Sequence, residues 1–377
     1  MEPDKKIIAT NHYGYPQEKN FLSLPLQHYR FIKSFDRHKL VSFLKFRLTG
    51  KIDHFHLNSH HRLIRGNISL FHFFNSISSG KIPWITTFET ILPRWGAVTQ
   101  KQLEKGIMMM AGSSCKQLIA MSQCALDMQK SMLEEKYSSV KNDILSKSIV
   151  LHPAQLIPAP SIIKKPADTL EFCFAGNDFF RKGGDVMLQV FAPLLEKNSH
   201  LRLTIISTLS WGDYASRSTR SDYENALQLI HRFPLQIKLL SRIPNNRVME
   251  VFGRSHVSLL PTLADSYGYS VLESQAASCP VISTDIRALP EINDTSSGWL
   301  LNMPKDHLGE GLIKSENDRF SFKKQLKEQL ENAIFEIIQN PDSISAKAHA
   351  SVERIKSKHN PKTTASVLES IYDQALL

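Results

Sequence analysis

Two carboxylates, Asp265 and Glu273, stand eight positions apart, and Gly268 lies between them in a polar loop. A glycine at this place lets the backbone approach a ligand, and a helix that starts after it presents N–H groups and the positive end of its dipole. A diphosphate group fits such a site. One carboxylate can then accept a hydrogen bond from a sugar hydroxyl and the other from a ribose. The competing interpretation is a solvated loop aspartate and a surface glutamate of an ordinary α/β protein.

These groups must be held between two buried strands. The apolar run Val257–Leu260 predicts the first strand, and Val281–Thr284 predicts the second. A helix is predicted from Tyr269 or Ser270, because apolar residues recur there at helical spacing. Pro280 follows its end, since proline cannot continue a helix. The first residues of this helix are therefore candidate ligands of the diphosphate.

A second group of charges is the pair Arg181 and Lys182, in a turn that ends with two glycines. Residues 171–175 predict a strand before this turn, and a helix is predicted from about Asp185. We expect both cations to face a cleft between two domains, where they would neutralise a leaving diphosphate. A solvated basic turn is the alternative.

The residues around both turns form a longer pattern. It consists of Asp265, Tyr267-Gly268, Leu272-Glu273, Ala276, Pro280-Val281-Ile282, Pro290-Glu291 and, in the basic turn, Lys182-Gly183. This pattern resembles the donor site of the retaining glycosyltransferases of family 4, the glycosyl transferases group 1, which have the GT-B fold. The resemblance is strongest over residues 170–295 and thin over residues 1–150.

Three positions around the two turns depart from the family pattern. Asp265 replaces the usual first glutamate, Ser278 replaces a glycine, and Asn177 replaces an arginine for which Arg181 can compensate. Aspartate is one methylene shorter than glutamate, so the sugar hydroxyl that it holds can differ. The donor sugar is therefore left open.

The resemblance implies roles for the charged residues. Arg181 and Lys182 would be catalytic cations on the leaving diphosphate, Asp265 would hold the sugar, and Glu273 would hold the ribose. No metal ion is implied. The resemblance implies no cofactor either, because the nucleotide-diphosphate sugar is the donor substrate.

Four further residues are implied by weaker matches. Gly14, after a predicted strand at residues 5–10, would lie near the donor phosphates, and Glu89 stands where the family often has a histidine that contacts the sugar. Arg242 and Ile243 lie in the loop where the family holds the nucleotide base.

Composition indicates an ordinary globular chain. A length of 377 residues predicts two domains of roughly 150–200 residues each. No apolar run approaches the roughly 20 residues of a membrane span, and the N-terminus has no signal-peptide core. The four cysteines show no CxxC pair, which predicts reduced residues in a cytoplasmic protein.

The positive charge is unevenly distributed. The first 150 residues contain 21 Lys and Arg against 11 Asp and Glu, so they carry the whole net charge of +10. A basic half implies an anionic partner: phospholipid head groups, a phosphorylated acceptor or nucleic acid. Residues 31–48 mix large apolar and basic side chains. They predict either a helix packed on the sheet or an interfacial helix on anionic lipid.

Histidines gather close to this basic stretch. His54–Leu57 is predicted to be a short strand, and four histidines fall within eight residues. They lack acidic or cysteine companions at ligand spacing, so a role other than metal binding is favoured.

Together these observations predict an α/β protein of GT-B fold, with two Rossmann-like domains facing across a cleft. Residues 1–160 would bind the acceptor and residues 167–345 the nucleotide sugar, while helices in residues 346–377 would pack back on the first domain. The predicted activity is retaining transfer, of hexosyltransferase type, to a glycan or lipid-linked acceptor in cell-surface polysaccharide or lipopolysaccharide synthesis. Contact with the inner face of an anionic membrane is an open alternative to a soluble acceptor.

Two rival functions are open at this point. One is a sugar-nucleotide epimerase or a phosphorylase on the same architecture. The other is a non-catalytic protein that binds an anionic polymer such as nucleic acid. The sequence lacks an interleaved aromatic and basic platform, so no nucleic-acid partner is expected.

Overall fold

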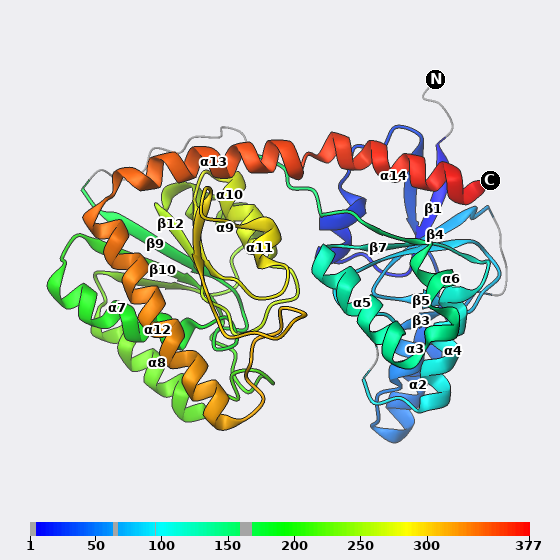
Figure 1. The fold of residues 1–377 in the computed structure, drawn as a ribbon, viewed down its shortest axis with the longest axis horizontal. Helices are drawn as coiled ribbons and strands as arrows, with labels where there is room; N and C mark the ends of the chain where they lie inside the picture. The colour runs from blue at the N-terminus through cyan, green and yellow to red at the C-terminus, as the bar shows by residue number, and fades with distance from the viewer. Residues whose placement is uncertain (1–4, 63–66, 95, 159–167) are drawn as a thin grey trace. The chain divides into compact units, whose positions relative to one another are not determined.

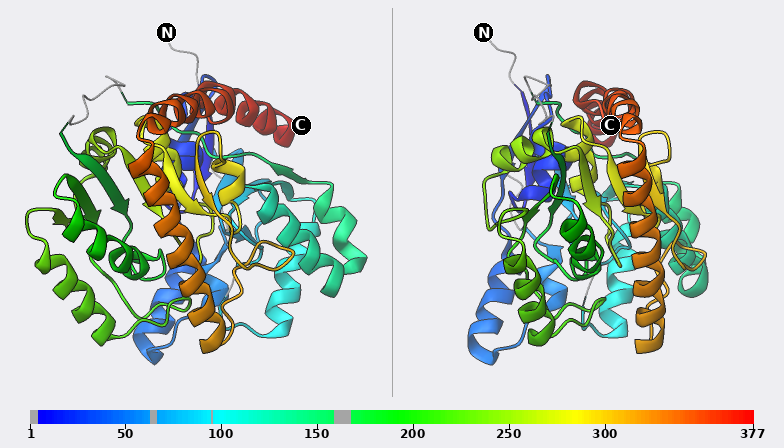
Figure 2. Two further views of the ribbon diagram at one scale, coloured as in Figure 1. Left: turned by 60° about the vertical axis from the view of Figure 1, so that its left-hand side comes forward. Right: turned by 90° about the vertical axis from the view of Figure 1, so that its left-hand side faces the viewer.

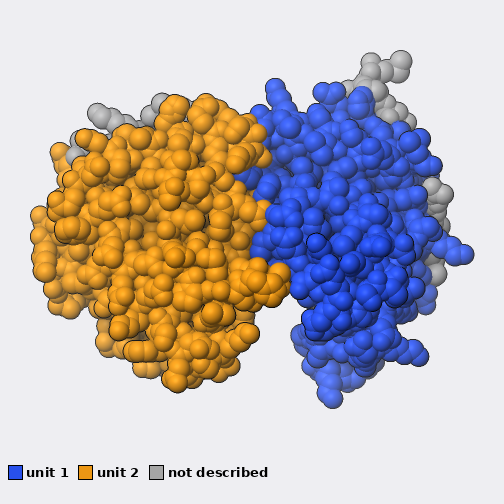
Figure 3. Space-filling model, viewed as in Figure 1, with its two compact units in different colours: residues 1–154, 359–377 blue, residues 155–358 orange. Residues whose placement is uncertain are grey.

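A computed structural model describes residues 5–62, 67–94, 96–158 and 168–377. The chain divides into two compact units, coloured separately in Figure 3. Unit 1 comprises residues 1–154 and 359–377, and unit 2 comprises residues 155–358. Each unit is built on one six-stranded parallel sheet, which confirms the prediction of an α/β protein with two Rossmann-like domains.

Unit 2 has the doubly wound strand order. Its first strand, β9, is central; the next two strands extend the sheet on one side and the last three on the other. The direction of winding therefore reverses between β9 and β12, where such sheets bind ligands. In sheet order the strands are β11 (Ile237–Leu240), β10 (Leu201–Ile206), β9 (Leu170–Ala175), β12 (Val257–Leu260), β13 (Val281–Thr284) and β14 (Gly298–Leu301).

The helices of unit 2 form two packed groups around this sheet (Figure 1). One group is α7 (Gly184–Lys197), α8 (Arg220–Arg232) and α12 (Glu316–Gln339). The other is α9 (Asn245–Arg254), α10 (Tyr269–Ala276) and α13 (Asp342–Lys358), and the short α11 (Leu289–Ile292) follows β13. The strand–loop–helix–strand prediction around Gly268 is confirmed, because β12, α10 and β13 have the expected places.

Unit 1 has a similar sheet with β1 near one edge. The order is β2 (Tyr29–Lys33), β1 (Lys6–Thr10), β4 (Leu70–Phe74), β6 (Trp84–Phe88), β7 (Cys115–Ala120) and β8 (Ser148–Val150). A small second sheet pairs β3 (Ser59–His60) with β5 (Ile77–Ser78). The helical segments are α1 (Tyr15–Gln17), the π-helical η1 (Glu18–Leu22), α2 (Arg37–Thr49), α3 (His54–Leu57), α4 (Gln100–Ala111), α5 (Gln123–Lys136), η2 (Ser138–Val140) and α6 (Lys141–Leu145).

Two local predictions in unit 1 were wrong. Residues 31–48 are not one helix: Phe31 and Ile32 lie in β2, which pairs with β1, and the helix begins only after Asp36. His54–Leu57 is the helix α3 rather than a strand. In both cases an aspartate caps the helix start, since Asp36 accepts from His38 N (3.0 Å) and Asp53 accepts from His56 N (3.1 Å).

The last helix, α14 (Pro361–Leu376), belongs to unit 1, where it contacts β4 and β7 (Figures 1 and 2). The Tyr372 hydroxyl bonds to His72 Nδ1 (2.7 Å), and His72 Nε2 bonds to the Thr87 hydroxyl (2.9 Å). Tyr29 donates to Asp373 (2.5 Å). Burial of the His72 ring lowers its pKa to about 3, so it stays neutral in this network.

The helix before it belongs to unit 2, which corrects the prediction that all of residues 346–377 pack on the first domain. Arg354 of α13 donates to the Glu291 carbonyl (2.6 Å) and pairs with Asp294. Ser351 donates to the Ser297 carbonyl (2.7 Å). These polar contacts fix residues 342–358 against the loops beside β14, and only α14 completes unit 1.

Candidate active site

Two loops meet at the switch point of the unit 2 sheet: residues 176–183 after β9 and residues 261–268 after β12. Leu263 N donates to the Arg181 carbonyl (2.9 Å), and the Thr262 hydroxyl donates to the same oxygen (3.1 Å). Gly183 has a φ of +78°, and a Cβ there would lie 1.9 Å from the Pro261 carbonyl oxygen. Only glycine therefore allows these two loops to touch.

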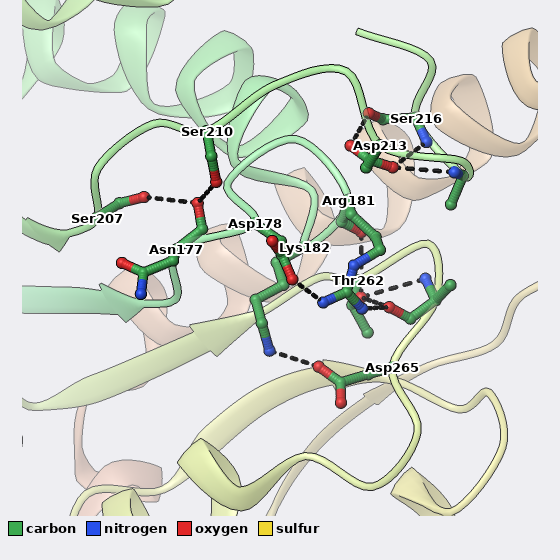
Figure 4. Close-up of polar contacts among 12 residues, drawn as sticks. Asn177, Asp178, Arg181, Lys182, Ser207, Ser210, Asp213, Ser216, Thr262 and Asp265 are labelled. Atoms are coloured by element: carbon green, nitrogen blue, oxygen red, sulfur yellow. Dashed lines mark hydrogen bonds and ion pairs between the residues drawn. The ribbon is translucent and has the colours of Figure 1, made fainter. Parts of the chain in front are cut away.

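The two loops bring Lys182 and Asp265 together (Figure 4). Lys182 Nζ forms an ion pair with Asp265 Oδ2, and the two side chains are 15% and 12% exposed. Gly176 makes room for the lysine stem, because a Cβ there would lie 2.3 Å from Lys182 Cδ. Burial alone would raise the pKa of Asp265, but the charges of Lys182 and Arg181 outweigh it and lower that pKa. Asp265 is therefore an ionised carboxylate beside a cation.

Arg181 lies beside this pair and is held by its own loop contacts. Its guanidinium donates to the Ala264 carbonyl and to the Asp178 carboxylate, and 17% of the side chain is exposed. The Asn177 carbonyl accepts from the hydroxyls of Ser207 (3.4 Å) and Ser210, so the loop after β10 is tied to the same turn (Figure 4). The structure thus brings Arg181, Lys182 and Asp265 together at one edge of the sheet.

The helix α10 begins next to these charges. Gly268, its N-cap, has a φ of +92°, and a Cβ there would lie 2.7 Å from Leu289 Cδ2. The glycine provides no side-chain acceptor to the helix, whose first residues are Tyr269 and Ser270. An α-helix start of this kind presents N–H groups and a positive dipole end to an anion.

Glu273 lies one turn into α10 and is buried, with 4% exposure. Its Oε1 accepts a hydrogen bond from Asn245 Nδ2 (2.9 Å), which comes from the first residue of α9. Asn245 was not predicted as a site residue. Asn245 and Glu273 are 28 positions apart in the sequence. The only sequence feature that could have indicated Asn245 is that it is a polar residue after Pro244, at a helix start.

Comparison with known proteins identifies this region. The family described as Glycosyl transferases group 1 matches residues 159–335. Unit 2 carries a glycosyl transferases group 1 domain. The predicted group is thus confirmed for this domain, while its assignment to family 4 stays a prediction.

Curated relatives of the chain are similar over a limited part. The chain is 27% identical to the D-inositol 3-phosphate glycosyltransferase of Thermobifida fusca over 147 residues. This alignment covers 38% of this chain and 33% of that protein. The enzyme of the same description from Acidothermus cellulolyticus is 25% identical over 154 residues, 41% of this chain and 34% of that protein. The similarity spans about a third of the length of these relatives.

Solved structures are similar over nearly the whole chain. Anabaena HepE in complex with UDP and glucose has a TM-score of 0.60 at 12% identity, covering 98% of this chain and 100% of that chain. Sucrose-phosphate synthase from Thermosynechococcus elongatus has a TM-score of 0.57 at 14% identity, covering 92% and 83%. These similarities establish the predicted GT-B fold.

The remaining donor-site prediction within the group 1 domain concerns Arg242 and Ile243. Both lie in the loop between β11 and α9, where Pro244 separates Ile243 from Asn245, and Arg242 has a φ of +49°. They are therefore close in the chain to the residue that holds Glu273. Their contact with a nucleotide base stays a prediction.

Gly14 and Glu89 lie in unit 1, outside the group 1 domain. Gly14 follows β1, and a Cβ there would lie 2.9 Å from His12 Nε2. Glu89 follows β6, where it forms an ion pair with Arg94 and accepts from Asn75 Nδ2 (3.1 Å). Both residues stand at carboxyl ends of parallel strands, as predicted, and their roles stay predictions.

Across residues 5–62, 67–94, 96–158 and 168–377, no group of three or more His, Cys, Asp or Glu side chains could hold a metal ion. In the same ranges no helix has the length and apolarity to cross a bilayer.

Proposed function

We propose that this protein is a retaining glycosyltransferase that moves a hexosyl group from a nucleotide-diphosphate sugar to a glycan or lipid-linked acceptor. The observation that carries the proposal is the ion pair of Lys182 and Asp265 at the switch point of unit 2. It puts a cation and an ionised carboxylate side by side at the edge where a doubly wound sheet binds ligands. The group 1 domain supports the same chemistry.

The donor would bind along the loops of this edge. Its diphosphate would lie at the start of α10, where Gly268 gives access to the helix N–H groups. Glu273, oriented by Asn245, would accept the ribose hydroxyl hydrogens. The HepE structures contain UDP or UDP-glucose, so a uridine-diphosphate sugar is the first donor to test.

Lys182 and Arg181 would act on the leaving group. When the bond between the anomeric carbon and the diphosphate oxygen breaks, the electron pair stays on that oxygen and its negative charge grows. An ammonium group has three donors, and Lys182 uses one of them on Asp265, so two can reach phosphate oxygens. Such charge stabilisation is worth more in the transition state than in the ground state.

The acceptor hydroxyl completes the reaction. Its oxygen would form the new bond to the anomeric carbon on the face from which the diphosphate leaves, which retains the configuration. Its proton would pass to the departing diphosphate, which has gained the electron pair. Asp265 would hold a sugar hydroxyl during this exchange, and the shorter side chain would set which hydroxyl it reaches.

The proposal can be tested by measuring the release of UDP from a panel of UDP-sugars. The acceptor panel should contain inositol 3-phosphate, which the names of the relatives suggest, and lipid-linked glycans. We expect release that depends on an acceptor, and a product with the anomeric configuration of the donor in its NMR spectrum. Epimerised donor formed without any acceptor would contradict the proposal.

A pair of variants adds a control. Lys182→Ala should lower kcat at least about 100-fold with a smaller change in KM, because its cation acts mainly in the transition state. Lys197→Ala removes an exposed lysine at the end of α7 and should leave both constants unchanged. A Lys182→Ala enzyme that differs from the control only in KM would show uniform binding and refute this role.

A further inference from the structure

The helix α2 exposes a concentrated set of large apolar side chains. Nine of the 21 exposed large apolar side chains of the described residues fall between positions 35 and 57, so this part of unit 1 carries a patch rather than a scatter. Only Ser42 of α2 is buried. The exposed members are Phe35, Leu40, Val41, Phe43, Leu44, Phe46, Leu48, Ile52 and Leu57, which we call the α2 patch.

The apolar side chains surround most of α2. At 3.6 residues per turn, the positions from Leu40 to Leu48 that carry them span roughly 220° of the circumference, on the side away from Ser42. An ordinary surface helix shows an apolar stripe of only about 100° and turns it toward the core. The exposed fractions of Phe43 (59%) and Leu48 (84%) show that this surface faces outward instead.

Polar contacts, rather than apolar packing, hold α2 in place. Asp36 caps its start, and Lys45 bonds to Asp53 (2.8 Å), which caps α3. Gly50 N donates to the Phe46 carbonyl (2.8 Å) and closes the helix end. The main contacts of α2 are with α3 and β3, and all three views leave α2 at the end of unit 1 opposite α14 (Figures 1 and 2). The helix is therefore preformed while its apolar side chains remain available.

The charge around the patch has one sign. Lys33, Arg37, Arg47 and Lys51 are exposed, whereas the two acidic residues of this segment, Asp36 and Asp53, are buried caps. A second copy of the chain would bring like charges together at this surface, which disfavours self-association. An anionic partner that also accepts apolar side chains fits both properties.

We propose that the α2 patch docks unit 1 on the surface of an anionic lipid bilayer. An apolar surface over more than half of a helix suits insertion among head groups and acyl chains, while the side around Ser42 stays packed on unit 1. A protein groove would need a single stripe. Interspersed cations then lie at the level of the lipid phosphates. The link to a lipid-linked acceptor rests on the proposed function, but the docking itself does not.

Vesicle co-sedimentation of the full chain tests the docking without any activity measurement. We expect binding to vesicles of phosphatidylcholine with phosphatidylglycerol, little binding to phosphatidylcholine alone, and a fall in binding as salt rises. Arg47→Gln and Lys51→Gln should each lower the partition coefficient about fivefold. Phe43→Ser and Leu48→Ser should each lower it about tenfold, since each removes a large apolar side chain that the bilayer would bury.

Matched controls lie on α12 of unit 2. Phe320 is 72% exposed and Lys324 is exposed, so Phe320→Ser and Lys324→Gln make the same changes away from the patch. They should bind vesicles like the wild type. Thermal unfolding of all variants confirms that they fold.

Each outcome decides the proposal. Binding that ignores lipid charge, equal binding by patch and control variants, or no binding to anionic vesicles would overturn it; the last result would point to an acidic protein partner. Wild-type vesicle binding without glycosyl transfer would instead refute the proposed function and leave the docking surface standing.

Discussion

Removing the charge of Lys182 should have separable effects on stability and on catalysis. Lys182→Met keeps most of the apolar stem that lies over Gly176 but leaves the Asp265 carboxylate without its partner. Breaking a buried ion pair from one side costs about 3–5 kcal/mol. Because the two side chains keep 15% and 12% exposure, we expect the lower end, about 3 kcal/mol. For a unit of this size that lowers Tm by about 6–12 °C.

The pH dependence of this contribution follows from the lowered pKa of Asp265. A carboxylate with a depressed pKa in the folded state stabilises the protein above its unfolded pKa of about 4. The contribution is lost as pH falls through the folded pKa. The destabilisation by Lys182→Met should therefore be full at pH 7 and shrink under acidic conditions.

A double-mutant cycle separates the two roles. Lys182→Met with Asp265→Asn removes both charges and should recover most of the lost Tm in differential scanning calorimetry, because no buried charge is left unpaired. Activity should stay at least about 100-fold down, since the cation on the diphosphate is still absent. Wild-type Tm in the single variant, or recovered activity in the double variant, would refute our account of this pair.

Three further predictions use other features of the chain. Glu273→Ala should weaken donor binding about tenfold or more in isothermal titration. Asn245→Ala should weaken it about fivefold, because Asn245 only orients the Glu273 carboxylate. Unchanged affinity in both variants would show that neither residue belongs to the ribose site. Gly183→Ala should destabilise unit 2 by about 2–4 kcal/mol in urea unfolding, because its Cβ would clash with the Pro261 carbonyl. In the control Gly212→Ala, φ is +84° but nothing lies within 4 Å of the new Cβ, so only the cost of a positive φ should appear. Equal effects of the two variants would show that the contact between Gly183 and Pro261 is unimportant. Since His72 titrates near pH 3 when folded and near 6.5 when unfolded, stability should fall as pH drops, by about 2 kcal/mol from pH 7 to 5. In His72→Gln this part of the loss should be absent, and an unaltered pH dependence would contradict the assignment.

The stretch around Gly268 could be predicted because its signals are local. An apolar run marks β12, a glycine with positive φ marks the start of α10, and Pro280 separates that helix from β13. The resemblance to a known family assigned Lys182 and Asp265 to the same donor site, but their ion pair was not predicted. Neither composition nor periodicity shows that residues 83 positions apart become partners.

One of the two errors in unit 1 arose where a long-range contact decides the structure. Phe31 and Ile32 continue a helical pattern in the sequence, but pairing with β1 makes them a strand. For the same reason the sequence did not reveal Asn245 and Asn75, whose amides bond to the candidate site carboxylates Glu273 and Glu89 from other elements. The capping aspartates were visible in the sequence, and Asp53 in particular marks α3 as a helix.

The position of α14 has a consequence for how the chain is made. Residues 1–154 of unit 1 are synthesised first. The hydrogen-bond partners of His72 and Tyr29, which are Tyr372 and Asp373, are synthesised only after all of unit 2. During synthesis the nascent first unit therefore lacks one of its packing elements while the second can already fold. A premature stop codon that deletes only α14 would leave the residues of unit 2 intact and remove a packing element from unit 1.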